Sequence, residues 1–321
     1  MKKAVKIWLI VAASLVLLGG IIFVGAMSMM KWDFLKFDTS KTVTNSYDIT
    51  DSFEGISVST SEAGIEILKS SDDNCKVVCH ERETVKHSVA VTDGKLTVNV
   101  EDGRKWYHHI SFFSISQPMI TVYLPESEYT SLSLKGSTGD ISVAKDFSFG
   151  SLDINVSTGD VKNHASVTND AKIKASTGYI SVENVSVGSL ELAVNTGHIK
   201  VNSVACENAL SIKVSTGKTE ISDIRCKNFS STGDTGKITM ENVIVAEKLS
   251  IERSTGDVKF DGCDAAEIFV KTDTGDVEGS LLTEKIFMAK TDTGKVEHPK
   301  TSRGGICEIT TDTGDIKIFL K

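Results

Sequence analysis

The chain has 321 residues, 40% of them hydrophobic and 24% charged, and its formal net charge is −8 at pH 7. This length and apolar content suffice for a folded core. The acidic balance, with no basic cluster after residue 6, argues against binding of nucleic acid.

The first predicted element is a transmembrane anchor at residues 7–30. Three lysines among the first six residues precede an uncharged stretch that is long enough to cross a bilayer as a helix. Positive charge on the short side predicts that residues 1–6 are a cytoplasmic tail and that the bulk of the chain is extracellular, as in a single-pass protein of the cell membrane. The alternative is a cleaved signal peptide, since Val24-Gly25-Ala26 resembles a cleavage site, although the apolar run exceeds a usual signal core.

The next segments are predicted to be a linker and an N-terminal β cap. Residues 31–48 are polar and mixed, which is typical of a tether. From 49 to 125 several stretches alternate apolar and polar residues without a clean period, for example 65–67 and 120–124. We expect this region to supply the first coils of a repeat array and to cover its open N-terminal edge, which would otherwise invite aggregation.

An aromatic segment within the cap region is a candidate contact patch. Trp106, Tyr107, His108 and His109 follow one another directly. Aromatic faces with polar edges suit contact with carbohydrate or protein. Packing within the cap is the alternative, and the sequence favours it.

A Thr-Gly turn recurs through the rest of the chain at intervals of 19 or 20 residues. So regular a period indicates stacked units, each too short to close a core alone. Glycine can take positive φ in such a turn without steric cost. The ten turn glycines are Gly139, Gly159, Gly178, Gly197, Gly217, Gly236, Gly256, Gly275, Gly294 and Gly314.

Each repeat carries three groups of alternating apolar residues. In the unit around Gly197, one group precedes the glycine (residues 190–194), a second follows it (199–201), and a third lies at 204–206, just after the bend-forming Ser203. The pattern predicts strand, turn, strand, corner and short strand. We therefore expect an all-β, single-chain parallel β-solenoid of about 20-residue coils at residues 126–321, with ten coils rising about 45–50 Å. An antiparallel meander is the alternative, but it leaves the third group unexplained.

Two departures from the repeat carry expectations of their own. An extra Thr-Gly at 232–233 predicts a local bulge before Gly236. Thr272, Thr291 and Thr311 replace apolar residues at inward positions, which makes the last coils more polar, as expected near a terminal cap.

The six cysteines suggest at most one disulfide. Cys206 and Cys226 share one phase of the repeat, so a solenoid places them about 5 Å apart on adjacent coils, where they form either a disulfide or two reduced thiols. Cys75 and Cys79 are too far apart in an extended strand to pair with each other. Cys263 and Cys307 differ in phase and are expected to be small core residues. None of these spacings indicates a metal site.

No catalytic or cofactor-binding residue is predicted. The Asp-Thr-Gly tripeptides, such as 273–275, mimic the aspartic protease motif, but they lie on the repeat grid and are expected to be structural. Calcium between carboxylates of neighbouring coils is an alternative that the sequence favours less, because alternating Lys and Asp after the glycines relieve repulsion without a metal. His164 and His198 lack a catalytic partner in the sequence, and no nucleophile or nucleotide motif is present.

The strongest motifs are Ser-Thr-Gly-Asp-Ile at 137–141, its variants at 157–161, 254–258 and 312–316, and the strand at 120–125 that leads into the array. Together they resemble a bacterial β-strand-repeat family of unknown function, usually labelled putative adhesin, which includes Lia-type membrane-anchored envelope proteins of Gram-positive bacteria. The resemblance spans residues 45–321 and implies a surface β-solenoid. Its motifs carry no catalytic residues.

The sequence therefore predicts a membrane-anchored extracellular β-solenoid that acts by contact, without catalysis. Its expected partners are the membrane, through the N-terminal helix, and a cell-wall or host glycan or protein. The alternatives are an accessory protein of cell-envelope stress signalling and a polysaccharide-active β-helix enzyme. The enzyme would need clustered outer carboxylates, for which Asp273, Asp276, Asp312 and Asp315 are the candidates.

Overall fold

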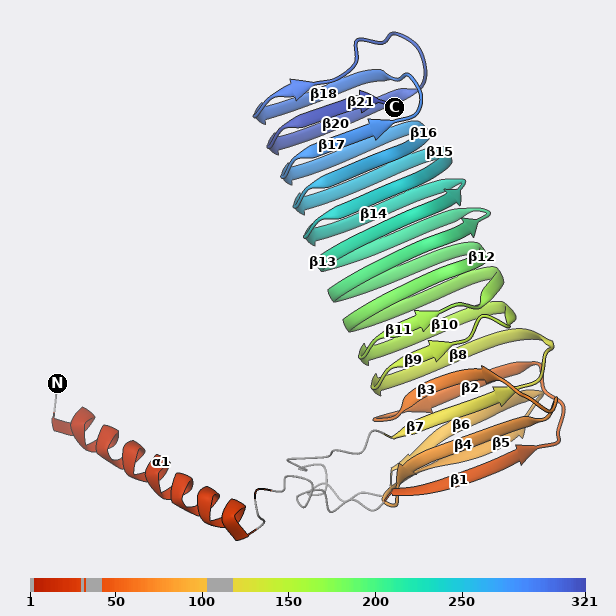
Figure 1. Cartoon of the computed structure of the whole chain (residues 1–321), viewed down its shortest axis with the longest axis vertical. Coiled ribbons are helices and arrows are strands. Elements are labelled where there is room, and N and C mark those ends of the chain that lie inside the picture. Colours follow the sequence, from red (N-terminus) through yellow and green to blue (C-terminus); the bar gives the residue numbers. More distant parts are fainter. Residues whose placement is uncertain (1–2, 30–31, 33–41, 103–117) are drawn as a thin grey trace. The chain divides into compact units, whose positions relative to one another are not determined.

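The computed structural model describes residues 3–29, 32, 42–102 and 118–321. The chain divides into two compact units, one of residues 1–42 with 104–117, and one of residues 43–103 with 118–321. In the first unit, helix α1 (Lys3–Met29) carries the expected apolar segment (Figure 1). Its residues Val5–Met29 are long and apolar enough to cross a membrane. The helix also includes residues 3–6, which the sequence placed in the tail.

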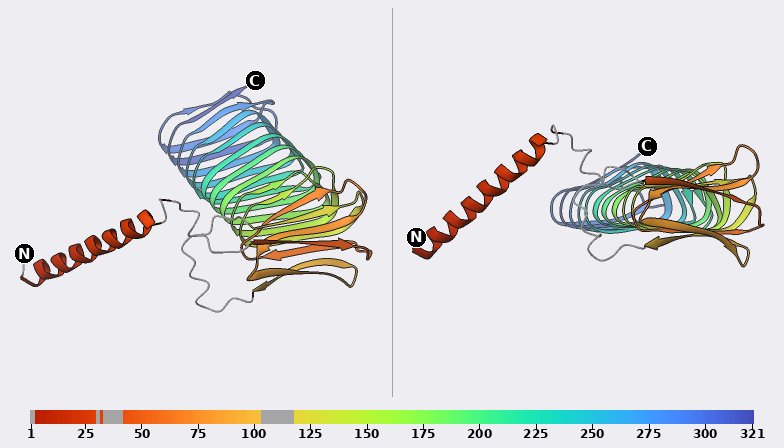
Figure 2. Two further views of the ribbon diagram at one scale, coloured as in Figure 1. Left: turned by 60° about the horizontal axis from the view of Figure 1, so that its bottom comes forward. Right: turned by 90° about the horizontal axis from the view of Figure 1, so that it is seen from below.

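The second unit consists of strands joined by tight turns, stacked coil on coil (Figures 1 and 2). Its strands are β1 (Thr42–Ile49), β2 (Gly55–Thr60), β3 (Gly64–Lys69), β4 (Cys75–Arg82), β5 (Val85–Thr92), β6 (Lys95–Asp102), β7 (Met119–Leu124), β8 (Glu128–Thr138), β9 (Ile141–Val143), β10 (Ser148–Thr158), β11 (Val161–Asn163), β12 (Ser166–Cys206), β13 (Ala209–Cys226), β14 (Asn228–Thr235), β15 (Ile238–Thr255), β16 (Val258–Thr274), β17 (Val277–Leu281), β18 (Ile286–Thr293), β19 (Val296–Glu297), β20 (Ile306–Thr313) and β21 (Ile316–Leu320).

Each coil pairs in parallel with the coils above and below it on three sides. Between β12 and β13, Leu192 pairs with Ile212, Val201 with Ile221, and Val204 with Ile224. These pairs come from the three apolar groups of one repeat. The parallel β-solenoid is therefore confirmed, and the antiparallel meander is excluded for the repeats.

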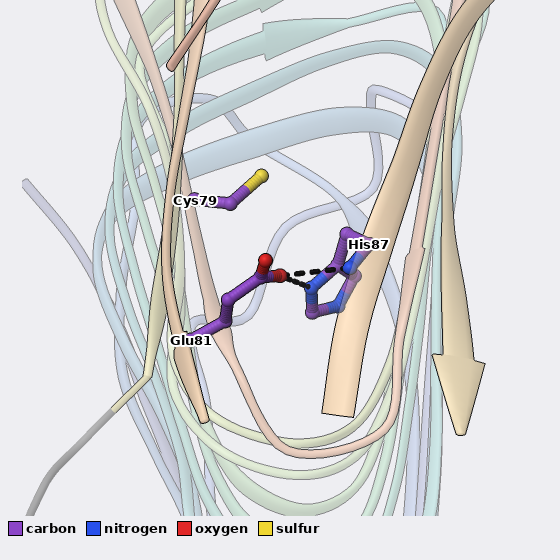
Figure 3. Close-up of side chains that lie close together, drawn as sticks. All are labelled: Cys79, Glu81 and His87. Carbon is purple, nitrogen blue, oxygen red and sulfur yellow. Dashed lines mark hydrogen bonds and ion pairs between the residues drawn. The ribbon is translucent and has the colours of Figure 1, made fainter. Parts of the chain in front are cut away.

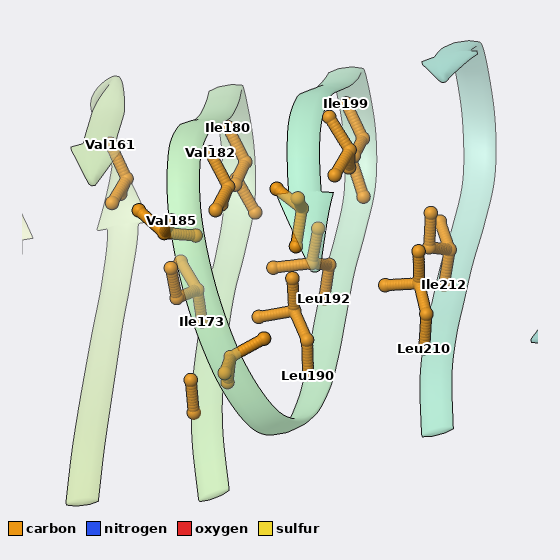
Figure 4. Packing of buried hydrophobic residues seen from close by; sticks show 14 of the residues in the cluster. Val161, Ile173, Ile180, Val182, Val185, Leu190, Leu192, Ile199, Leu210 and Ile212 are labelled. Atoms are coloured by element: carbon orange, nitrogen blue, oxygen red, sulfur yellow. The ribbon is translucent and has the colours of Figure 1, made fainter. Parts of the chain in front are cut away.

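The core is a continuous stack of aliphatic side chains inside the coils (Figure 4). Leu192, Ile199 and Ile212 are at most 1% exposed. Because every coil returns an apolar residue to the same place, like side chains stack along the interior and each coil buries its neighbours. At about 25 cal/mol per Å² of apolar surface, this burial is the main stabilising contribution.

The corners of the coils carry the predicted short polar residues in a left-handed backbone conformation. Asn184, Ser203, Asp223 and Asn242 have φ between 52° and 58°, and Gly262 occupies the next corner at 62°. Short polar side chains tolerate this conformation because they can bond to local backbone groups. The predicted corner is confirmed.

The ten turn glycines form a column along one edge of the coils. All ten have positive φ, between 115° and 156°. A Cβ atom built on Gly217 would lie 1.6 Å from the carbonyl oxygen of Gly197, and Gly236 is in the same position over Gly217. The turns need glycine for two reasons, the backbone conformation and the approach of the neighbouring coil.

At the N-terminal end the parallel ladder begins earlier than residue 126. Strands β2 and β3 form a coil without a Thr-Gly turn, pairing in parallel with β8 and β9. On its other side this coil pairs in parallel with β6 and β7. Beyond those strands the pairing turns antiparallel, with β7 against β4 and β6 against β5. Strand β1 pairs with β4, so residues 42–48 belong to this end and not to the linker expected over 31–48.

At the C-terminal end the coils are stacked out of chain order. Strand β20 lies between β16 and β18, and β21 lies between β17 and β19. The last coil of the chain is therefore inserted beneath the one before it, which leaves β18 as the edge. Ile286 and Met288 on β18 are 44% and 48% exposed.

The inward threonines of the last coils bond to the glycine column. Thr311 Oγ1 donates to the carbonyl of Gly275 at 3.1 Å, and Thr291 Oγ1 donates to that of Gly314 at 2.9 Å. Thr272 and Thr311 are 1% and 3% exposed. A hydroxyl group can replace an aliphatic group here because a turn carbonyl of the next coil accepts its hydrogen bond.

Candidate functional site

Three residues with metal-binding or catalytic side chains meet inside the N-terminal end of the solenoid (Figure 3). Cys79 and Glu81 lie on β4, and His87 lies on β5, so the group spans the interior between two walls. Their ligand atoms all lie within 4.8 Å of one another. Cys79, Glu81 and His87 are 0%, 1% and 4% exposed.

The carboxylate and the imidazole are directly paired. Glu81 Oε2 lies 2.7 Å from His87 Nδ1 and accepts the backbone N–H of His87 at 2.8 Å. The other carboxylate oxygen accepts from Asn45 Nδ2 at 2.7 Å. Asn45 belongs to β1, so a segment expected to be linker helps to hold the site.

The far side of the histidine ring contacts a buried hydroxyl. His87 Nε2 lies 3.1 Å from Thr60 Oγ1, which also accepts the backbone N–H of Ala63 at 3.2 Å. Burial, with the nearby Glu81 carboxylate as the smaller cause, raises the pKa of the Cys79 thiol to about 12. The thiol is therefore protonated at neutral pH. A buried histidine, a carboxylate and a hydroxyl in line resemble a nucleophilic triad, but with all three buried a polymeric substrate has no access.

We expect Thr60→Val to destabilise the folded state by about 2 kcal/mol, because the isosteric side chain leaves the Ala63 N–H and His87 Nε2 without their partner. Urea unfolding of the two proteins measures the difference. Thr130→Val is the matched control: its hydroxyl bonds to the carbonyl of Glu54 on the exposed surface, so water can replace it. Equal losses in the two variants would contradict the role given to Thr60.

The sequence missed this site for an identifiable reason. Glu81 and His87 occupy inward positions of alternating strands, where Cys75, Val77 and Val85 are also buried. The sequence contained one indication of the site: a charged and a polar residue stand at positions of the alternating pattern that are otherwise apolar. Only the tight connection between β4 and β5, with Arg82 pairing with Val85, brings them face to face.

A second polar group lies inside the solenoid where the sequence predicted a bulge before Gly236. That prediction is wrong: β14 pairs with β13 and β15 in unbroken register, with Gly233 opposite Val214 and Arg253. The small residues instead make room for Arg253, which is 5% exposed. Its Nη2 donates to Ser231 Oγ at 2.8 Å.

The Arg253 guanidinium is not fully satisfied. Its Nε has no hydrogen-bond partner among the described residues. Burial lowers the pKa of Arg253 to about 10, and the carboxylate of Asp234 opposes that shift. Hydroxyl groups thus solvate a buried cation that would normally be paired with a carboxylate. A surface pocket of about 230 Å³ borders this position, but the Arg253 side chain is buried and its guanidinium bonds to Ser231 inside the coils, so we assign it to the core.

Cys206 and Cys226 are buried free thiols on adjacent coils. Cys206 Sγ donates to the carbonyl of Ala209 at 3.1 Å. Burial raises the pKa of Cys226 to about 12. All six cysteines are free and buried in the structure, including Cys263 and Cys307 as expected.

We expect the folded protein to show no thiol that reacts with an aromatic disulfide reagent at pH 8, and the denatured protein to show six. A Cys206–Cys226 disulfide would leave four reactive thiols after denaturation, because two of the six would be oxidised.

The free energy of unfolding should fall as the pH rises from 9.0 towards 12. Thiols such as Cys226 and Cys307 ionise in the unfolded chain over this range, whereas burial keeps them protonated in the folded protein. The free energy of unfolding of the Cys226→Ala variant should fall less steeply over that pH range, because one ionising thiol is removed.

A groove of about 710 Å³ crosses the third side of the coils. Its floor includes Val167, Val187 and Cys206, and Ser166 and Ser186 lie along it. At one end the exposed side chains of Lys227 and Glu247 form an ion pair of 3.4 Å. A groove that crosses several coils suits an extended chain better than a compact molecule.

The face after the glycine turns carries a second polar surface. The ring of Tyr179 packs against His198 with centroids 5.2 Å apart. His198 Nε2 lies 3.3 Å from Glu220 Oε2 on the next coil, so the structure supplies the acidic neighbour that the sequence did not show. Both side chains are partly exposed.

The aspartates after the turn glycines bond to backbone. Asp140 Oδ1 accepts the N–H of Asp160 at 2.8 Å, and Asp160 Oδ1 accepts that of Tyr179 at 2.9 Å. Asp276 and Asp315 continue this ladder, with Asp276 Oδ1 accepting the N–H of Asp315 at 2.8 Å. These contacts give the carboxylates a structural role between coils.

The aromatic patch Trp106, Tyr107, His108 and His109 lies outside the described residues. Its expected role as a contact patch or as part of the cap therefore stays a prediction.

A family model described as Toastrack DUF4097 matches residues 53–209 and again 205–321. A search of curated proteins finds no match.

Several solved bacterial structures are similar to the chain at low identity. A protein described as a putative adhesin of Bacteroides fragilis is 15% identical, with a TM-score of 0.46, over 87% of this chain and 97% of that one. One described as a putative lipid binding protein of Parabacteroides distasonis is 14% identical, with a TM-score of 0.49, over 88% and 98%. A putative adhesin of Parabacteroides merdae is 11% identical, with a TM-score of 0.48, over 77% and 98%.

Proposed function

Because this chain belongs to the Toastrack DUF4097 family, we propose that it is a single-pass membrane protein whose β-solenoid is displayed outside the cell and acts by contact. Membership agrees with the resemblance to the β-strand-repeat family labelled putative adhesin. The proposed partner is an extended polymer, a cell-wall or host glycan or a protein. Catalysis has no part in the proposal.

The observation that carries the proposal is the separation of an apolar helix from a self-contained β unit. The helix residues Val5–Met29 meet the length and composition of a membrane span. The solenoid has a continuous core built from residues 56–318. A chain built in this way can hold a rigid surface at a membrane.

The groove on the third side of the coils is the proposed contact surface. It crosses β10, β12, β13 and β15, and the residues on it come from successive coils at regular spacing. A polymer with its own repeat can lie along such a surface and make the same contact several times, which raises overall affinity without a deep pocket.

The test has two parts, and both use the full-length chain. A membrane-impermeant amine reagent applied to intact cells should label lysines of the solenoid, and exclusive labelling after lysis would contradict outward display. The chain purified in detergent should bind at least one polymer in a panel of peptidoglycan, teichoic acids and matrix proteins. Absence of binding across the panel would contradict the contact role and favour envelope-stress signalling.

The groove itself is tested with Ser186→Trp, which places a bulky ring on an exposed groove position without touching the core. We expect this variant to lose at least tenfold in affinity for any polymer found in the panel, because one blocked site interrupts contacts along the groove. Lys213→Trp, on an exposed position outside the groove, is the control. Unchanged binding of Ser186→Trp would move the contact surface elsewhere.

A further inference from the structure

We propose that Cys79, Glu81 and His87 form a binding site for one divalent transition-metal ion of the zinc type. The site lies inside the N-terminal end of the solenoid and is separate from the proposed contact groove. It binds an ion that stabilises this end of the molecule.

The three side chains supply the ligands that zinc prefers: a thiolate sulfur, a carboxylate oxygen and an imidazole nitrogen. Among the described residues they are the group of such side chains whose ligand atoms converge within 4.8 Å. In Figure 3 Cys79 and Glu81 project from one wall of the interior and His87 from the other. An ion between them would join β4 and β5 across the core.

The polar groups around the cluster match those that orient metal ligands in proteins. Asn45 Nδ2 donates to Glu81 Oε1 at 2.7 Å, the carboxylate oxygen that does not face the ring. Thr60 Oγ1 lies 3.1 Å from His87 Nε2, the ring nitrogen that does not face Glu81. Glu81 and His87 are thus each held by a second contact, which fixes the direction of the side chain toward the centre.

The proton and charge balance is simple. When the ion binds, the Cys79 thiol loses one proton to solvent, and His87 coordinates through an unprotonated Nδ1, so that its ring proton lies on Nε2. Nε2 then donates to Thr60 Oγ1, which can accept it together with the Ala63 N–H. The dication is neutralised by one thiolate and one carboxylate, so the buried complex carries no net charge.

Three protein ligands leave a fourth position of a tetrahedral ion for water. The cluster on β4 and β5 is contacted by Asn45 and Tyr47 of β1 and by Thr60 of β2. On β4, Cys79 is also paired with Ile120 of β7. Because these elements close over the cluster, the ion would enter during folding, and chelation of the folded protein would be slow.

The experiment uses the full-length chain in detergent, refolded with and without zinc or cadmium. We expect one ion per chain by elemental analysis, and a thiolate-to-cadmium charge-transfer band in the ultraviolet. X-ray absorption of the zinc-loaded wild type should show one sulfur ligand with nitrogen and oxygen ligands. This measurement needs no variant, so it decides the proposal even if substitutions in the cluster prevent folding. Absence of bound metal, or bound metal without sulfur, would overturn it.

Variants then locate the site. Cys79→Ser should abolish the cadmium band, whereas Cys75→Ser should keep it. Cys75 is the matched control, since it lies on the same strand, is also buried and also has a thiol pKa raised to about 12 by burial, but stands outside the cluster. Asn45→Ala should weaken zinc binding about tenfold, because it frees one carboxylate oxygen. A band that survives Cys79→Ser would contradict the assignment.

Discussion

Gly217→Ala is expected to destabilise the solenoid by about 3–6 kcal/mol, enough to unfold the neighbouring coils. The φ of Gly217 is 142°, a conformation that residues with a side chain rarely adopt. The added methyl group would lie 1.6 Å from the carbonyl oxygen of Gly197. The backbone of two coils must therefore move apart, which breaks the ladder on both sides of the turn. Urea unfolding followed by circular dichroism measures the loss.

Gly94→Ala separates the two contributions. Gly94 also has a positive φ, 70°, but a Cβ there would meet no atom within 4 Å. We expect a loss of about 1–2 kcal/mol from backbone conformation alone. If both variants lost the same amount, the close approach between coils would contribute nothing, and the glycine column would be explained by turn conformation only.

Gly233→Ala is expected to cost about 3 kcal/mol, through a different contact. A Cβ at this position would lie 1.9 Å from Arg253 Nη1 and 2.3 Å from the carbonyl oxygen of Val214. The methyl group would displace the guanidinium from its bond to Ser231 Oγ at 2.8 Å. The buried cation would then lose its shortest hydrogen bond among the described residues.

Gly136→Ala is the matched control, because Gly136 occupies the same position of its repeat, three residues before the turn glycine. Its nearest neighbour would be a methyl carbon of Val156 at 3.7 Å. We expect no loss, or a gain of about 0.5 kcal/mol, since alanine restricts the unfolded chain. The Arg253→Met background should reduce the cost of Gly233→Ala by about 1–2 kcal/mol in a double-mutant cycle. A cost unchanged by Arg253→Met would show that the guanidinium is not what occupies the space.

The two polar groups in the interior differ in what they can do. Arg253 is a cation whose hydrogen-bond partners among the described residues are hydroxyl groups, and the neighbouring coil has small side chains where it lies. Cys79, Glu81 and His87 combine acceptors and a thiol that can together neutralise a dication. Of these two groups, the cluster of Cys79, Glu81 and His87 is therefore the one for which we propose a bound ion.

The order of the final coils has a consequence for the open end of the solenoid. Because β20 and β21 insert beneath β18 and β19, the edge consists of a strand that is not the last in the chain. Its outward residues Lys290 and Asp292 are charged and form an ion pair of 3.1 Å. Charged side chains on an edge strand discourage addition of further strands.

The repeat pattern determined the coil. Period, turn glycines, three apolar groups and polar corners all follow from local rules that each repeat obeys by itself, so ten copies in one chain make the inference secure. The apolar helix α1 could be predicted equally well, because a candidate membrane span is recognised by the length and composition of one continuous segment.

Where a residue departs from the repeat, its meaning depends on which strands become neighbours, and no local rule decides that. The extra Thr-Gly at 232–233 predicted a bulge, but in the structure Arg253 of the next coil fills the space beside it. In the sequence, Glu81 and His87 are two polar residues at inward positions with no evident partner. In the structure, the tight connection between β4 and β5 places them opposite each other across the core. The stacking order of the last two coils was also open, because their turns and apolar residues are interchangeable and only the packing of whole coils distinguishes one order from the other.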